Sequence, residues 1–214
     1  MGECMTEIIV TGAAERQLPA DRAALQLSSS HAGPERAEVV AAAGARHAQL
    51  VERAQQLVAD GSAESYTAEA VTTYTNSWRD EGGAQLVEHR ANVSVGVELL
   101  ALEAVGALTT EFAEAGTDAN VSWKLSDPAR QAVLRELRAA AVADAEAAAA
   151  DYAAALGGPA LSLREIRDTS AGRGVAPIGA PRFAMMADAG APPEVTVHDI
   201  GVRVEIDARF ATAE

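Results

Sequence analysis

The sequence predicts an α+β fold in which mainly antiparallel sheets with long hairpin strands are packed by three helices. Several segments alternate apolar and polar residues with the period of two that is typical of strands with one buried face. Three other segments place apolar residues at helical spacing. Strands mostly follow one another directly, which differs from the strand–helix alternation of a doubly wound parallel sheet. The predicted order of elements is ββαββαβαββ.

The chain begins with two predicted strands and a long helix. Residues 7–11 and 22–31 are the strands, and the turn residues at 19–21 separate them. A helix is predicted from Pro34 to about residue 59, because apolar residues there recur at helical spacing and Asp60-Gly61 closes the segment.

Two long strands, 63–78 and 85–99, are predicted to form a hairpin around the turn at 79–83. The second strand alternates so regularly that one of its faces is expected on the core and the other toward water or a partner. The first strand is rich in Thr and Tyr, and Tyr66 and Tyr74 are predicted to share a face. Strands of this length exceed the usual five or six residues and often extend beyond a compact sheet.

The longest helical pattern of the chain lies between Ser126 and Pro159. Asp127 can cap its first amides, Pro128 suits its first turn, and Gly157 suits the left-handed position after its end. Because alanine dominates the middle of its apolar stripe, we expect a sheet or another helix to approach it closely. The predicted stripe is Leu134, Leu137, Ala141, Ala145, Ala148, Tyr152 and Leu156.

The remaining elements are a short helix at 102–115 and strands at 119–125, 160–168 and 200–210. Residues 169–194 hold half of the prolines and show no periodicity, which predicts a flexible loop. The middle of this loop contains an apolar cluster of Phe183, Met185 and Met186. The cluster is interpreted either as a docking patch for another subunit or as incidental apolar residues of a mobile loop. The whole chain, 1–214, is predicted to be a single domain or two intertwined α+β sub-units.

Composition restricts the function classes. The net charge of −14 and the absence of a basic run argue against nucleic acid and against an anionic membrane face. A single cysteine, Cys4, excludes an intrachain disulfide framework and a multi-cysteine zinc site. The first residues lack the positive and apolar regions of an export signal, so we expect a soluble cytoplasmic protein.

No catalytic motif stands out. The sequence contains no Gly-rich phosphate loop and no Gly-x-Ser-x-Gly elbow, and the four histidines are scattered without metal-ligand spacing. We therefore assign no catalytic, cofactor-binding or metal-binding residues, and we expect a protein that is not an enzyme and needs no cofactor.

Several segments resemble the SIMPL-domain family, a domain of unknown function. They are residues 10–12 with 19–23, residues 121–127, the alanine-rich helix that ends at Gly157, and the strand 202–206. The resemblance covers nearly the whole chain. It implies an α+β protein that assembles into homo-oligomers and, in bacteria, is linked to defence against oxidative stress; it implies no catalytic residues.

The leading functional hypothesis is therefore a non-enzymatic, self-associating protein of the stress response. The alternative is a small-molecule or metal-binding stress protein that uses a groove between the sheet and the alanine-rich helix. The predicted partner is a second copy of the chain. The predicted interaction surface consists of Phe183, Met185, Met186, Tyr66, Tyr74 and Trp78.

Overall fold

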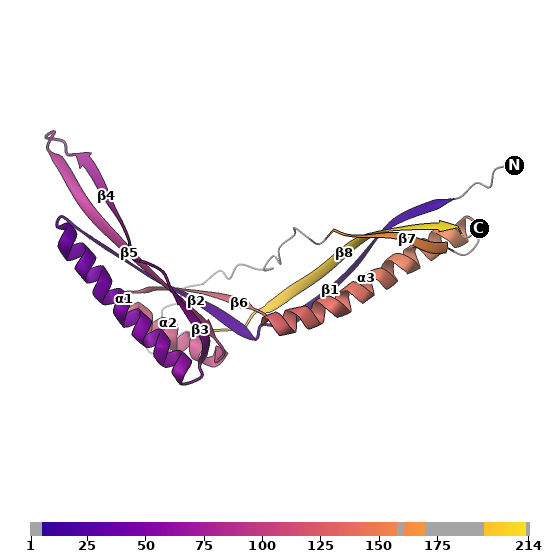
Figure 1. The fold of residues 1–214 in the computed structure, drawn as a ribbon, viewed down its shortest axis with the longest axis horizontal. Coiled ribbons are helices and arrows are strands. Elements are labelled where there is room, and N and C mark those ends of the chain that lie inside the picture. The colour runs from indigo at the N-terminus through magenta and orange to yellow at the C-terminus, as the bar shows by residue number, and fades with distance from the viewer. Residues whose placement is uncertain (1–5, 158–160, 170–194, 213–214) are drawn as a thin grey trace. The chain divides into compact units, whose positions relative to one another are not determined.

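The α+β fold class is confirmed by the computed structural model, which describes residues 6–157, 161–169 and 195–212 (Figure 1). In these residues three α-helices accompany two antiparallel sheets. The elements are β1 (Glu7–Pro19), β2 (Arg22–Gly33), α1 (Arg36–Ala59), β3 (Ala63–Ala68), β4 (Thr72–Arg79), β5 (Gln85–Leu99), the 3-10 helix η1 (Leu102–Ala104), α2 (Val105–Glu114), β6 (Asp118–Lys124), α3 (Asp127–Ala155), β7 (Leu161–Asp168) and β8 (Asp199–Thr212).

The order of elements differs from the predicted one at a single place. The strand predicted at 63–78 is divided into β3 and β4, both of which pair with β5. Ala68 of β3 lies opposite Val95, and Thr72 of β4 lies opposite Asn92. The chain therefore advances four residues from β3 to β4 while the partner strand β5 advances three. The extra residue exchanges the two faces of the strand, because side chains alternate with a period of two.

The described residues divide into two compact units that are interleaved along the chain. The first unit contains residues 6–19, 125–157, 161–169 and 199–212, and the second contains residues 20–124 and 195–198. The loop predicted at 169–194 lies outside the described residues apart from Thr169.

In the first unit, α3 packs on one face of a three-stranded sheet with the order β1-β8-β7 (Figure 1). β1 and β8 pair in one uninterrupted antiparallel register from Glu7–Ala211 to Pro19–Asp199. The core is built from aliphatic residues and one phenylalanine: Ile8, Val10, Val133, Leu137, Ala141, Ala145, Ala149, Ala153, Val202, Val204, Ile206, Ala208 and Phe210.

The alanine-rich side of α3 lies unusually close to β1, as its composition predicts. A Cβ atom placed on Gly12 would lie 2.1 Å from the carbonyl oxygen of Ala141 and 2.7 Å from the Cβ of Ala145. Only glycine fits there, because real Cβ atoms do not approach other heavy atoms so closely. Beside this contact, a carboxylate oxygen of Asp144 accepts a hydrogen bond of 2.9 Å from the backbone N–H of Ala13.

The predicted stripe of α3 is correct in its first half and wrong in its second. Leu137, Ala141 and Ala145 are buried, but the buried row then continues through Ala149 and Ala153. Tyr152 and Leu156, which were expected in the core, are 60% and 69% exposed. The buried residues recur every four positions, so their row winds around the helix along the twisted sheet and does not stay on a straight line.

The other face of this sheet carries charged residues, as the alternation along residues 200–210 predicts. Arg203 lies near Glu15 and Glu205, at 3.6 Å and 3.1 Å, and Thr11 donates a hydrogen bond to Asp207. These pairs are exposed and contribute little to stability individually. They make this face compatible with water.

In the second unit, β3, β5, β2 and β6 form a sheet in this order, with β4 continuing alongside β5. One face is buried beneath α1 and α2, and its core includes Leu25, Leu27, Val95, Val97 and Leu99. The opposite face is polar over β2 and β5, where Gln26 donates a hydrogen bond to Ser94. The prediction of one core face and one polar face for β5 is therefore confirmed.

The two helices of this unit are joined by arginines of α1. Arg53 donates two hydrogen bonds, of 2.7 and 2.8 Å, to the carboxylate of Glu111 in α2, and this interaction raises the pKa of Arg53. Arg46 donates to the carbonyl of Ala115, which follows the last residue of α2. A cation is favoured there because the carbonyls at a helix C-terminus carry partial negative charge.

Candidate interaction surface

The structure places three of the six residues predicted for the interaction surface. Phe183, Met185 and Met186 lie outside the described residues. Tyr66 lies in β3, and Tyr74 and Trp78 lie in β4. Only the last two can be evaluated together as a surface.

Tyr66 and Tyr74 lie on opposite faces of the sheet, so the prediction that they share a face is wrong. Tyr66 is opposite Val97, a buried residue, and packs against the core of the second unit. Its hydroxyl accepts a hydrogen bond from Gln55 of α1. Tyr74 is opposite Arg90, on the uncovered face. The extra residue between β3 and β4 causes this exchange of faces.

Tyr74 and Trp78 lie on one face of the hairpin formed by β4 and β5, which extends past the start of α1 (Figure 1). All eight residues of β4 are exposed. Tyr74 and Trp78 are 45% and 47% exposed, and Leu86, directly opposite Trp78, is 41% exposed. We call this surface the arm face, defined as Tyr74, Asn76, Trp78, Leu86, Glu88 and Arg90.

The arm face carries an ion pair next to its apolar residues. Arg90 donates a hydrogen bond of 2.6 Å to Glu88, two residues earlier on the same strand. This bond, followed by the charge of Glu88 and a hydrogen bond with Tyr74, raises the pKa of Arg90. The face therefore presents one cation and one anion beside two aromatic rings and a leucine, a composition that is typical of protein interfaces.

Leu86 belongs to the arm face but was not predicted as an interaction residue. The alternation of β5 already indicates its position, since Leu86 falls on the same side as Glu88, Arg90 and Ser94. An apolar residue at a polar position of an alternating strand is the signal that could have identified it.

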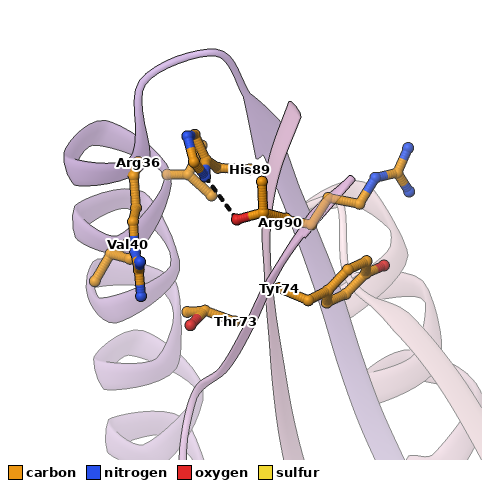
Figure 2. Close-up of a pocket in the computed structure, with 8 residues that line it drawn as sticks. Arg36, Val40, Thr73, Tyr74, His89 and Arg90 are labelled. Carbon is orange, nitrogen blue, oxygen red and sulfur yellow. Dashed lines mark hydrogen bonds between the residues drawn. The ribbon is translucent and has the colours of Figure 1, made fainter. Parts of the chain in front are cut away.

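The opposite side of the hairpin forms a cleft of about 190 Å³ with the N-terminal half of α1 (Figure 2). Thr73 and His89 face α1, whereas Tyr74 points to the other side. The ring of His89 forms a hydrogen bond of 3.0 Å with the hydroxyl of Thr75. Arg36 lines the cleft from α1 and has no ion-pair partner among the described residues.

The described residues contain no group of three His, Cys, Asp or Glu side chains that could hold a metal ion. The histidines of this part of the chain have separate environments: His31 lies near Ser29, His89 bonds to Thr75, and His198 lies 6.5 Å from the ring of Trp123. The Nε2 atom of His47 is buried and has no hydrogen-bond partner among the residues that the structure describes. No helix within residues 6–157, 161–169 and 195–212 is long and apolar enough to cross a membrane.

Comparison with known families gives one match, which extends over residues 8–210. The matching family is described as SIMPL, a protein of unknown function (DUF541). A comparison with curated proteins found no match. The match covers both units and includes the strands and helices described above.

Proposed function

The chain belongs to the SIMPL (DUF541) family, whose function is unknown, and we propose that it is a non-enzymatic protein that acts by self-association. The observation that carries this proposal is the arm face. A two-stranded ribbon is marginally stable in water unless it packs against something, and this ribbon presents Tyr74, Trp78 and Leu86 to solvent. A partner that covers this face would bury apolar surface and stabilise the hairpin.

A second copy of the chain is a suitable partner for the arm face. Two arm faces related by a two-fold axis present the same residues to each other, so Trp78 and Leu86 of one copy can pack against those of the other. In this arrangement Glu88 of one copy can lie against Arg90 of the other, which avoids like charges. Aromatic rings supply large contact areas at such interfaces.

We expect the double substitution of Trp78→Ser and Leu86→Ser to shift the protein toward smaller species. Both side chains are exposed in the single chain, so the substitutions remove contact area between copies while the core stays intact. Sedimentation velocity at micromolar concentrations measures the effect. The matched control is Val195→Ser with Val197→Ser, two exposed residues away from the hairpin, which should leave the distribution unchanged.

Fluorescence gives a second readout of the same interface. Trp78 is one of two tryptophans, and assembly through the arm face should shift its emission to shorter wavelength as the concentration rises. A wild-type protein that stays strictly monomeric at micromolar concentrations would contradict the proposal of self-association.

The second candidate function is binding of a small molecule in the cleft between α1 and the hairpin. The groove first expected between the sheet and the alanine-rich helix has no room at Gly12, where the backbone of α3 is in direct contact with β1. The cleft instead combines the guanidinium of Arg36, which has no ion-pair partner in the described part of the chain, with the side chains of Thr73 and His89, and this is favourable for a small anion.

We expect phosphate or acetate to raise the unfolding temperature if this second candidate is correct, because a ligand that binds only the folded state stabilises it. Arg36→Gln should remove the increase. Arg130→Gln, which changes an exposed arginine on α3, should retain it. The candidate is wrong if the increase is zero or is equal in both variants.

A further inference from the structure

Within residues 6–157, 161–169 and 195–212, β1 is an edge strand whose outer side has no neighbouring strand. The sheet order β1-β8-β7 leaves β1 paired with β8 alone, over 13 residues without a bulge. Natural proteins usually protect such an edge by shortening it, by placing charges on it or by interrupting it with a bulge. β7, the other edge of this sheet, has a bulge between Leu163 and Glu165 and carries four charged residues at and after it: Arg164, Glu165, Arg167 and Asp168.

The first half of β1 is protected at one point only, where the carboxylate of Asp144 binds the N–H of Ala13. Residues 8–14 contain no charge and begin with three consecutive β-branched side chains. An uncharged segment that is rich in β-branched residues readily pairs with another strand. The chain therefore exposes a strand edge that is suited to accept a partner.

The backbone groups that face this edge can be identified from Asp144. Its carboxylate accepts the N–H of Ala13, so the backbone groups of Ala13 point away from β8. The backbone N–H and C=O groups of successive residues point to alternate sides of a strand, and the register of β1 is uninterrupted. The N–H groups of Ile9 and Thr11 therefore point away from β8, like those of Ala13. Neither N–H has a hydrogen-bond partner among the described residues.

The three most exposed large hydrophobic side chains of the described residues are Leu156, Ile9 and Tyr152, at 69%, 64% and 60%. Ile9 lies on β1 itself, on the face of the sheet away from α3, whereas Tyr152 lies on α3 and Leu156 at its C-terminal end. Asp144, Ala148, Tyr152 and Leu156 follow one another at intervals of four, so they form one row along α3. Since Asp144 reaches the edge of β1, the row that it begins runs along the same side of α3 as this edge.

Resting on the proposed self-association, we propose that a second copy of the chain adds its β1 to this edge, antiparallel and with a two-fold axis near Ile9. The two three-stranded sheets then form one continuous sheet. Ile9 lies opposite its own copy and Thr11 lies opposite Glu7, so no like charges face each other across the axis. The free N–H groups of Ile9 and Thr11 gain partners.

The same axis brings the two α3 helices together. α3 packs over β1 and β8, and strands are about 4.8 Å apart, so the two helix axes would be separated by about 10 Å. This is close to the 8–10 Å at which helices pack. Tyr152 and Leu156, exposed in the single chain, would lie between the two helices together with the small side chain of Ala148.

We expect Ile9→Glu to abolish this contact between copies and to leave each chain folded. Within one chain the new carboxylate lies directly opposite Arg209, which tolerates it. Across the two-fold axis two carboxylates would face each other. The matched control is Ile166→Glu on β7, an isoleucine that is 45% exposed at the other edge of the same sheet. Sedimentation velocity should show loss of the β1-mediated species for Ile9→Glu alone.

Cross-linking tests the register directly. In a Cys4→Ser background, Ile9→Cys places two thiols on opposing strands with their Cα atoms about 5.5 Å apart, within the range that a disulfide spans. Mild oxidation should link two chains for Ile9→Cys and leave Ile166→Cys monomeric on a denaturing gel.

The outcomes separate this proposal from the proposed function. If the wild-type protein self-associates but Ile9→Glu assembles like Ile166→Glu, and Ile9→Cys does not cross-link, the pairing of β1 strands is wrong and self-association through the arm face remains. If the wild-type protein is monomeric throughout the micromolar range, both proposals are wrong.

Discussion

Replacing Gly12 with alanine should lower the free energy of unfolding of the first unit by about 3 kcal/mol, at the upper end of the range for overpacked cores. The added methyl group would lie 2.1 Å from the carbonyl oxygen of Ala141 and 2.9 Å from the backbone nitrogen of Ala145. Both atoms belong to the backbone of α3, so no side-chain rotation relieves the contact. The helix must move away from β1, and it loses its contacts with the alanines that follow.

Thermal unfolding followed by far-ultraviolet circular dichroism should detect this loss as a decrease of about 12–24 °C in the transition of the first unit. The matched control is Gly44→Ala. Gly44 lies in the interior of α1, and a Cβ atom there has nothing within 4 Å. Because alanine is the better helix former, this variant should be more stable by about 0.5–1 kcal/mol. Equal effects in the two variants would show that the contact at Gly12 is not tight.

The elements of this fold could be predicted from the sequence wherever one period dominates. The long helix before Gly157 and the strand at 85–99 were predicted nearly to their ends, because turn residues and alternation mark them. The predicted cap Asp127 is wrong, since Ser126 is the N-cap and its hydroxyl accepts a hydrogen bond from the N–H of Ala129. β1 was predicted only as far as residue 11, although it continues to Pro19. The part beyond residue 11 begins with Gly12, Ala13 and Ala14, which have low strand propensity, and pairing with β8 overrides that propensity.

The interaction surface was predicted less completely than the fold. The extra residue between β3 and β4 leaves no compositional mark, yet it places Tyr66 in the core and Tyr74 on the surface. Tyr152 and Leu156 occupy apolar positions that a straight helical stripe assigns to the core. Their exposure depends on how the buried row of α3 follows the twist of the sheet, which is a property of the packed unit.

The second large effect is expected for Leu27→Ala in the core of the second unit. Leu27 is fully buried on β2, which pairs with β5 on one side and with β6 on the other. Its Cα partners are Val95 and Ala119. Truncation removes three buried carbon atoms and leaves a cavity beneath α1 and α2, so the free energy of unfolding should fall by about 2–5 kcal/mol.

Tryptophan fluorescence is the appropriate measurement for Leu27→Ala, because Trp78 and Trp123, the two tryptophans of the chain, lie in the second unit. The midpoint in urea should decrease, since a core cavity lowers stability without changing the surface that unfolding exposes. Leu100→Ala removes the same atoms from a side chain that is 38% exposed and should have a much smaller effect. Similar midpoints for both variants would mean that Leu27 does not contribute to a tightly packed core. A large difference would support the assignment of β2 as the central buried strand. The core face of its sheet is then the one beneath α1 and α2, and the uncovered polar face and the arm face lie on the opposite side.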